Sequence, residues 1–134
     1  MTLFQEFVRE HRELDELFGR FLAAVHAEDA EGAAAAIAEF DDRLRSHTAR
    51  EDETVFVVVA GEKLLEREAE DESARRFRQL RLEHVQVREV TGMIRRLLSE
   101  KADLEGARRL APNLARRWDA HTTREEREVF ASGG

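Results

Sequence analysis

Four stretches of the sequence carry apolar residues at steps of three or four, and each stretch has one histidine in the same register. The four residues, His11, His47, His84 and His121, are separated by 36, 37 and 37 positions. Steps of three and four place side chains on one face of an α-helix. The sequence therefore predicts four amphipathic helices, each with a histidine on its buried face.

The predicted helices cover residues 3–26, 32–60 and 72–100, and a fourth helix follows Asp103 as its N-cap. Thr2 and Gln5 have the spacing of a capping box at the start of the first helix. Gly61 and the charged residues up to Asp71 predict a break or a short extra turn. Because Pro112 lacks a backbone donor, the fourth helix is expected to kink or restart there.

The segment VFVVV at 55–59 has side chains that favour β-strands. It nevertheless continues the stepping of three and four from His47 through Val55 and Val58, so we predict that it is helical. The remaining valines then point away from the core. They are either ordinary exposed residues near a helix end or, less favoured, a contact for a partner.

Four helices joined by short connections predict an all-α fold, an up-down-up-down antiparallel four-helix bundle, and residues 1–134 are expected to form one domain. The distance from each histidine to the nearest chain reversal is nearly the same on paired helices. This places all four histidines in one layer. The helix segments between the histidines and the 61–71 connection are shorter than those between the histidines and the other connections. The layer is therefore expected off-centre, toward the end that holds both termini.

Composition and charge narrow the classes of partner. The net charge of −7 disfavours nucleic acid, and no charge-free run is long enough to span a membrane. The absence of cysteine excludes a disulfide framework, a cysteine zinc site and an iron–sulfur cluster. A cytoplasmic location is expected, because the N-terminal stretch is amphipathic and acidic, unlike a secretory signal. The excess of arginine over lysine suggests a bacterial, GC-rich genome.

The chain contains a near-duplicate motif. HTAREDETVF at 47–56 and HTTREEREVF at 121–130 agree at six of ten positions and lie 74 residues apart. The pairs Glu10-His11 and Glu83-His84 repeat with nearly the same offset. A doubled two-helix unit, related by a pseudo-two-fold axis along the bundle, explains both repeats.

The histidine layer is predicted to bind metal. Residues four apart share a helix face, so two carboxylates join the four imidazoles. Buried carboxylates cost roughly several kcal/mol each unless something compensates them. Two divalent cations would do so, and this donor set suits iron, manganese or zinc. The predicted metal ligands are His11, His47, Glu51, His84, His121 and Glu125. His26 lies off the stripe and is expected to be exposed.

The chain resembles the hemerythrin-like family, also called HHE cation-binding domains, over nearly its whole length. The resemblance rests on EHREL at 10–14, HTARED at 47–52, EH at 83–84 and HTTREE at 121–126. It implies a four-helix bundle with two non-haem iron ions. One ion would be held by His84 and His121, the other by His11 and His47, with Glu51 and Glu125 bridging.

Three positions depart from the family pattern or stay open. Where the family usually has a second histidine, one turn after His84, this chain has Arg88. Arg88 turns outward to surface acids, which we favour, or reaches a bridging carboxylate, or indicates that only one metal binds. Asp15, one turn after His11, is an extra ligand, a residue that orients a histidine or a solvated acid, and the last two are favoured. The acid of the last helix is Glu125 or, with a five-residue step, Glu126.

The resemblance leads to three hypotheses about function. The favoured one is a metal-binding protein that reversibly binds or senses O2 or another small diatomic or peroxide ligand, or handles iron. The alternative is a di-iron oxidase, peroxidase or nitric-oxide-handling enzyme, because the missing histidine opens coordination space. The third is a metal-free bundle in which Arg88 neutralises the acids. A monomer or weak homodimer is expected.

Overall fold

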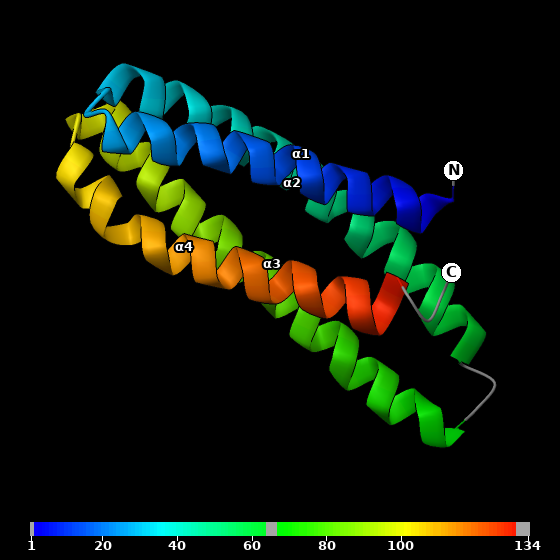
Figure 1. Cartoon of the computed structure of the whole chain (residues 1–134). Helices are drawn as coiled ribbons and strands as arrows, with labels where there is room; N and C mark the ends of the chain where they lie inside the picture. Colours follow the sequence, from blue (N-terminus) through cyan, green and yellow to red (C-terminus); the bar gives the residue numbers. More distant parts are fainter. Residues whose placement is uncertain (1, 64–66, 131–134) are drawn as a thin grey trace.

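The computed structural model describes residues 2–63 and 67–130, and side chains outside 55–74. The elements are α1 (Leu3–His26), α2 (Ala30–Lys63), α3 (Arg67–Lys101), α4 (Leu104–Glu125) and the π-helical turn η1 (Glu126–Phe130) that continues α4. Each helix packs antiparallel to the next, and α1 also contacts α4, which closes the bundle (Figure 1). The predicted all-α four-helix bundle is confirmed.

The start of α1 follows the prediction. Thr2 Oγ1 accepts a hydrogen bond from the Gln5 backbone N–H at 3.1 Å, and Gln5 Oε1 accepts from the Thr2 N–H at 2.9 Å. Both halves of the capping box are therefore present, and they satisfy two backbone donors that a helix N-terminus leaves free.

The two short turns of the bundle use the same device. Asp29 accepts from the Gly32 N–H at 2.9 Å, and Asp103 accepts from the Gly106 N–H at 2.8 Å. A Cβ atom on either glycine would lie 2.3–2.5 Å from the capping carboxylate, so a larger residue there would require the aspartate side chain to shift. The cap at Asp29 starts α2 two residues before the predicted position. The residue before each cap has a positive φ, 58° at Glu28 and 48° at Ala102.

The predicted break over 61–71 is wrong for most of its length. α2 continues to Lys63 and α3 starts at Arg67, while 64–66 lie outside the described residues. One glycine costs a helix only about 1 kcal/mol relative to alanine, so Gly61 alone does not end α2. The segment 55–59 is helical as predicted, but the directions of its valines lie outside the described side chains.

α4 runs without interruption through Pro112, so the expected restart is wrong. Proline removes one backbone hydrogen bond, but neighbouring apolar side chains keep the helix packed on the bundle. Ala111 and Leu114 on either side are both buried. Tertiary packing therefore outweighs the local preference at this position.

The histidine layer lies between two clusters of buried apolar side chains. The larger cluster includes Phe21, Ile37 and Leu114, and the smaller one includes Phe7 and Phe130 near the chain ends. The layer is close to the ends of α1 and α4, as expected, but near the middle of α2 and α3. These two helices are longer than predicted and extend beyond their neighbours (Figure 1).

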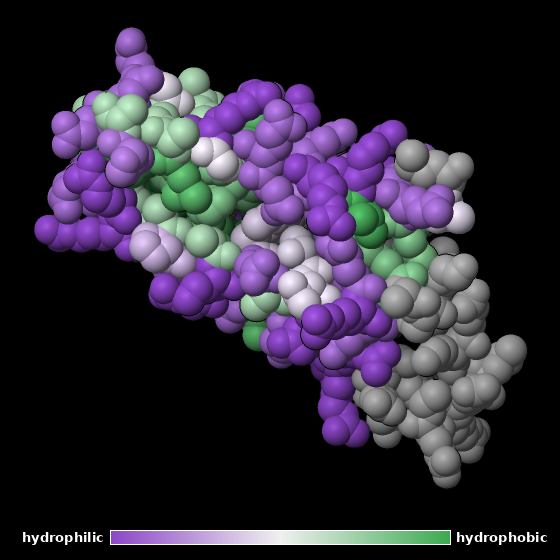
Figure 2. All heavy atoms as spheres, viewed as in Figure 1, coloured by the Kyte–Doolittle hydropathy of each residue, from purple (hydrophilic) through white to green (hydrophobic). Residues whose placement is uncertain are grey.

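The outer surface agrees with the high content of charged residues. Figure 2 shows hydrophilic side chains over most of the face viewed, with hydrophobic residues gathered toward the end that carries the two short turns. None of the described helices contains an apolar stretch long enough to cross a bilayer.

Candidate metal centre

The six side chains singled out as ligands meet in one buried layer. α1 and α3 each contribute one histidine, whereas α2 and α4 each contribute a histidine and the glutamate one turn later. The six are His11, His47, Glu51, His84, His121 and Glu125, and each is at most 3% exposed. His26, at the end of α1, is exposed as predicted.

The two glutamates occupy the middle of the layer, and each faces three imidazoles. Glu51 lies 3.0 Å from His47 Nε2, 3.2 Å from His84 Nε2 and 3.5 Å from His11 Nε2. Glu125 lies 3.0 Å from His121 Nε2 and 3.1 Å from both His11 Nε2 and His84 Nε2. Every Nε2 atom of the layer therefore points inward at a carboxylate.

These donors form two overlapping groups. The first contains His11, His47, Glu51 and Glu125, and the second contains His84, His121 and the same two glutamates. Within each group the ligand atoms lie within 4.8 Å of one another. Imidazole nitrogens and carboxylate oxygens at this separation are suited to binding divalent metal ions.

A second set of carboxylates holds the outer nitrogens of the imidazoles. The contacts are His47 Nδ1 to Glu10 at 2.6 Å, His84 Nδ1 to Asp52 at 2.8 Å, His121 Nδ1 to Glu83 at 2.8 Å and His11 Nδ1 to Glu126 at 3.0 Å. An ionised carboxylate only accepts hydrogen bonds, so each Nδ1 carries the proton and donates. In the neutral imidazole each Nε2 then presents a lone pair to the centre, as metal-bound histidines require.

The arginines of the duplicated motif support this outer set. Arg50 of α2 donates to Glu10, and Arg124 of α4 donates to Glu83 at 2.9 Å. In each half of the chain, one motif thus supplies an inner histidine and glutamate, the arginine that fixes a neighbouring carboxylate, and an acid for a histidine on another helix. Sequence reasoning missed these roles, although the repeated Glu-His pair and the acid after each glutamate signalled them.

Glu125 and Glu126 lie in different places relative to the histidine layer. Glu125 belongs to both donor groups, whereas Glu126 is 29% exposed at its side chain and bonds the outer nitrogen of His11. η1 starts at Glu126, and its Val129 and Phe130 are buried beside the layer. π-helical turns frequently occur at functional sites, and no pattern in the sequence predicted this one.

Arg88 and Asp15 do not enter the layer. Arg88 donates to Thr48 Oγ1 at 3.5 Å, and within the described part of the chain it forms no ion pair, so the favoured pairing with surface acids is wrong. Asp15 accepts from Trp118 Nε1 at 2.7 Å. It therefore orients an indole that packs on His11, with ring centroids 5.5 Å apart, instead of orienting a histidine directly.

The charges of the layer shift the pKa values of its members. Burial lowers the pKa of His11, but hydrogen bonds and charges from Glu125 and Glu51 outweigh it and raise that pKa to about 10. The pKa of His84 rises to about 11, because Asp52, Glu125 and Glu51 outweigh burial in the same way. Burial raises the pKa of Glu125, but the charge of His121 and hydrogen bonds from three histidines lower it well below the usual value.

Several inward atoms nevertheless lack a hydrogen-bond partner of acceptable geometry. They are His11 Nε2, His47 Nε2, His121 Nε2, both carboxylate oxygens of Glu51 and Glu125 Oε1. All six belong to the two donor groups. Buried polar atoms are nearly always satisfied in folded proteins, so this concentration at one point indicates a missing partner that accepts lone pairs.

Aromatic rings cover the layer on both sides. Phe7 meets His47 edge-on at 5.6 Å between ring centroids, and Phe130 lies 5.7 Å from His11. Trp118 covers the side toward the larger apolar cluster and is 3% exposed. The rings restrict water and lower the local dielectric, which strengthens electrostatic interactions inside.

Fold and site together define a class of protein: four-helix bundles with a buried histidine and carboxylate centre suited to metal ions. The chain matches the family described as Hemerythrin HHE cation binding domain over residues 2–132. It belongs to this family, as its motifs predicted. No curated protein and no solved structure matches the chain.

Proposed function

We propose that this protein holds two iron ions in the buried layer and uses them to bind or sense O2 or another small ligand, or to handle iron. His11, His47, Glu51 and Glu125 would hold one ion, and His84, His121 and the same glutamates the other. Iron in such a site supplies open coordination positions for a small ligand.

The observation that carries the proposal is the convergence of six unpartnered buried atoms. With neutral imidazoles, the nitrogen and carboxylate lone pairs face one another at 3.0–3.5 Å, which is costly in a buried site. Cations coordinated by these lone pairs remove that cost. The outer carboxylates also hold each imidazole with Nε2 free, an arrangement that ligation needs and a plain hydrogen-bonded core does not.

Two ions fit the donor set better than one. The two groups of donors have different histidines and share Glu51 and Glu125. A single ion would therefore leave the two histidines of the other group without a metal. Arg88 approaches neither glutamate within ion-pair distance among the described residues, which leaves the carboxylates available to cations.

The side chains of the bundle have definite tasks in this proposal. The outer acids fix the tautomer and direction of each imidazole, and the two arginines fix Glu10 and Glu83. Phe7, Phe130 and Trp118 restrict access of water. The acids near the centre are thus engaged either as donors or in holding histidines. For this reason we favour ligand binding over an enzyme that needs a free proton donor.

A metal count tests the proposal first. Protein from iron-supplemented cells, or metal-free protein reconstituted with Fe2+ without oxygen, is expected to contain about two equivalents of iron. Less than about a tenth of an equivalent of any transition metal would support the metal-free bundle instead. One equivalent would retain metal binding and reject the paired site.

A spectroscopic experiment then separates binding from catalysis. The reduced, iron-loaded protein is exposed to O2, and the oxygen is afterwards removed. A visible absorption change that reverses on removal supports reversible binding. Consumption of hydrogen peroxide over many turnovers, with no reversible species, would support the enzyme alternative.

A further inference from the structure

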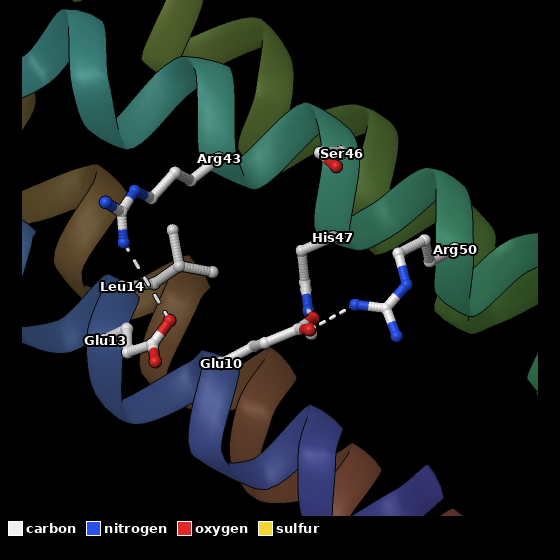
Figure 3. Close-up of a pocket in the computed structure, with 7 residues that line it drawn as sticks. All are labelled: Glu10, Glu13, Leu14, Arg43, Ser46, His47 and Arg50. Carbon is white, nitrogen blue, oxygen red and sulfur yellow. Dashed lines mark hydrogen bonds and ion pairs between the residues drawn. The ribbon is translucent and has the colours of Figure 1, made fainter.

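A cavity of about 170 Å³ opens between α1 and α2, directly beside one half of the centre. Its wall includes Glu10, Glu13, Arg43, His47 and Arg50 (Figure 3). His47 belongs both to this wall and to the buried layer, where its Nε2 is unpartnered. The cavity therefore reaches from solvent to a predicted metal ligand.

Two ion pairs flank the cavity, and they differ in strength. Arg50 donates to Glu10, which in turn holds His47. Arg43 lies 3.8 Å from Glu13, and both side chains are about half exposed. A pair at that distance in water contributes about 1 kcal/mol or less, so it opens readily. The outer edge of the cavity is easily displaced, whereas the inner edge is fixed.

The contact between α1 and α2, called the α1–α2 seam, has a counterpart between α3 and α4, called the α3–α4 seam. The pseudo-two-fold axis relates the two seams, so the residues at equivalent positions can be compared. Arg43 lies 3.2 Å from Glu39 as well as 3.8 Å from Glu13. Its counterpart Arg117 donates to Asn113 at 2.8 Å and to Gln86 at 3.3 Å. The arginine is thus kept in both seams, but its two acidic partners become amides in the second.

A third position changes in the same direction. Glu6 lies 3.8 Å from Arg50, and its counterpart Gln79 donates to Glu83 at 3.0 Å. Each seam keeps one acid that holds a histidine, Glu10 or Glu83. Three acids of the α1–α2 seam therefore have neutral counterparts of similar shape in the α3–α4 seam.

The two seams consequently carry opposite charge. The α1–α2 seam has four acids and three arginines, Arg9 beside Glu13 included, so its formal charge is −1. At the matched positions, all of which have described side chains, the α3–α4 seam has one acid and two arginines, and Leu82 replaces Arg9, so the formal charge of these positions is +1. Seams of opposite sign at the same distance from one buried centre attract cations to one side and repel them from the other.

We infer that divalent cations enter the centre through the α1–α2 seam, where they are captured at the cavity and pass beside His47 into the layer. This inference rests on the proposed metal-binding function. Displacement of the exposed Arg43–Glu13 pair opens the cavity, and the Glu6, Glu13 and Glu39 carboxylates attract the cation. The α3–α4 seam, which carries positive charge at the matched positions, does not serve as the entrance.

The first experiment measures how fast Co2+ loads the metal-free full-length protein in a stopped-flow instrument. Trp118, the sole tryptophan, packs on His11 and His121, so its fluorescence reports arrival of the metal. In the E6Q/E13Q/E39Q variant the loading rate is expected to fall about tenfold at low ionic strength and to recover toward the wild-type rate in high salt. The amount of Co2+ bound at equilibrium should stay the same.

Two control variants separate the seam from net charge. E28Q/E31Q/E105Q removes the same number of acids near the short turns, and Q79E/Q86E/N113D adds acids to the opposite seam. Compared with the seam variant at about 0.1 M ionic strength, where charges more than about 10 Å away are largely screened, each is expected to change the rate by less than about twofold. An equal slowing in the first control, or a matching acceleration in the second, would overturn the inference.

A steric pair tests the route independently of charge. Ser46 lines the cavity, and its pseudo-symmetric counterpart is Ala120; both residues are exposed, so a larger side chain is tolerated at either position. S46F should slow both loading and chelator extraction of Co2+, whereas A120F should slow neither. Equal rates in both variants would reject the α1–α2 route. Wild-type protein that binds no Co2+ would instead reject the proposed function itself.

Discussion

Replacing Glu125 by glutamine removes a charge from the carboxylate shared by both donor groups while keeping its shape. Glu125 lies within 3.1 Å of three imidazole nitrogens. Metal that binds only the folded state at 100 times its Kd contributes about 2.7 kcal/mol per site, so two sites contribute roughly 5 kcal/mol. For a chain of this length that corresponds to about 15–25 °C in Tm.

The diagnostic quantity is the difference in Tm between metal-loaded and metal-free protein. Glu125→Gln also lowers the metal-free Tm, because three imidazoles lose a carboxylate partner, so absolute values do not isolate the metal. The difference between the two forms should fall by more than half, since both ions lose a ligand. Differential scanning fluorimetry with saturating metal and with chelator measures it, and metal analysis gives the stoichiometry.

Glu126→Gln is the matched control, one residue along the chain. Its amide oxygen can still accept from His11 Nδ1, so both metals stay bound and affinity falls about tenfold. The Tm difference should then shrink by only about 5 °C. If Glu126→Gln lost the metal and Glu125→Gln kept it, the assignment of the two acids would be reversed and the inner layer would be wrong.

Three further outcomes are expected. The pKa values of His11 and His84 are raised to about 10 and 11, so their stabilisation of the metal-free protein is complete below about pH 6.5 and is lost as pH rises through those values. The metal-free Tm should thus fall from pH 6.5 to 10, whereas the increment from metal should grow as protons compete less; a flat metal-free profile would contradict the charge pairing. Asp15→Asn should shift the fluorescence of Trp118 and cost about 1 kcal/mol in urea unfolding, with metal content unchanged, because a hydrogen bond weakens outside the layer. His26→Ala should alter neither metal content nor Tm, and a loss of metal there would mean that the ligands are misassigned.

Sequence periodicity was sufficient for the helices and for the position of the inner side chains, because both depend on which residues share a helix face. Periodicity failed at the helix boundaries, where the preference of a single residue competes with that of its neighbours. A single glycine at Gly61 and a proline at Pro112 were given the weight they have in isolated helices, but α2 and α4 continue through these residues. The start of α2 was missed because Asp29, which caps it, lies within a turn-like run of small and acidic residues.

The outer carboxylates show a different limit of sequence reasoning. Each of them bonds a histidine on another helix, so its role depends on the relative rotation of two helices, which periodicity along one chain does not fix. Glu10 and Glu83 precede their own histidines yet bond His47 and His121. Only the exact repetition of these pairs in both halves of the chain indicated that they had a common task.

The charge of the whole layer gives an independent reason for two cations. Two inner glutamates and four outer acids carry six negative charges, and Arg50 and Arg124 carry two positive charges. The formal charge of the layer is therefore −4 when all imidazoles are neutral. Arg12, 3.6 Å from Glu126, is 68% exposed and largely screened by solvent. Two divalent cations would neutralise the layer, whereas one would leave a formal charge of −2 on it. In the metal-free protein, protons on His11 and His84 compensate part of this charge, because the surrounding carboxylates raise the pKa values of these residues to about 10 and 11.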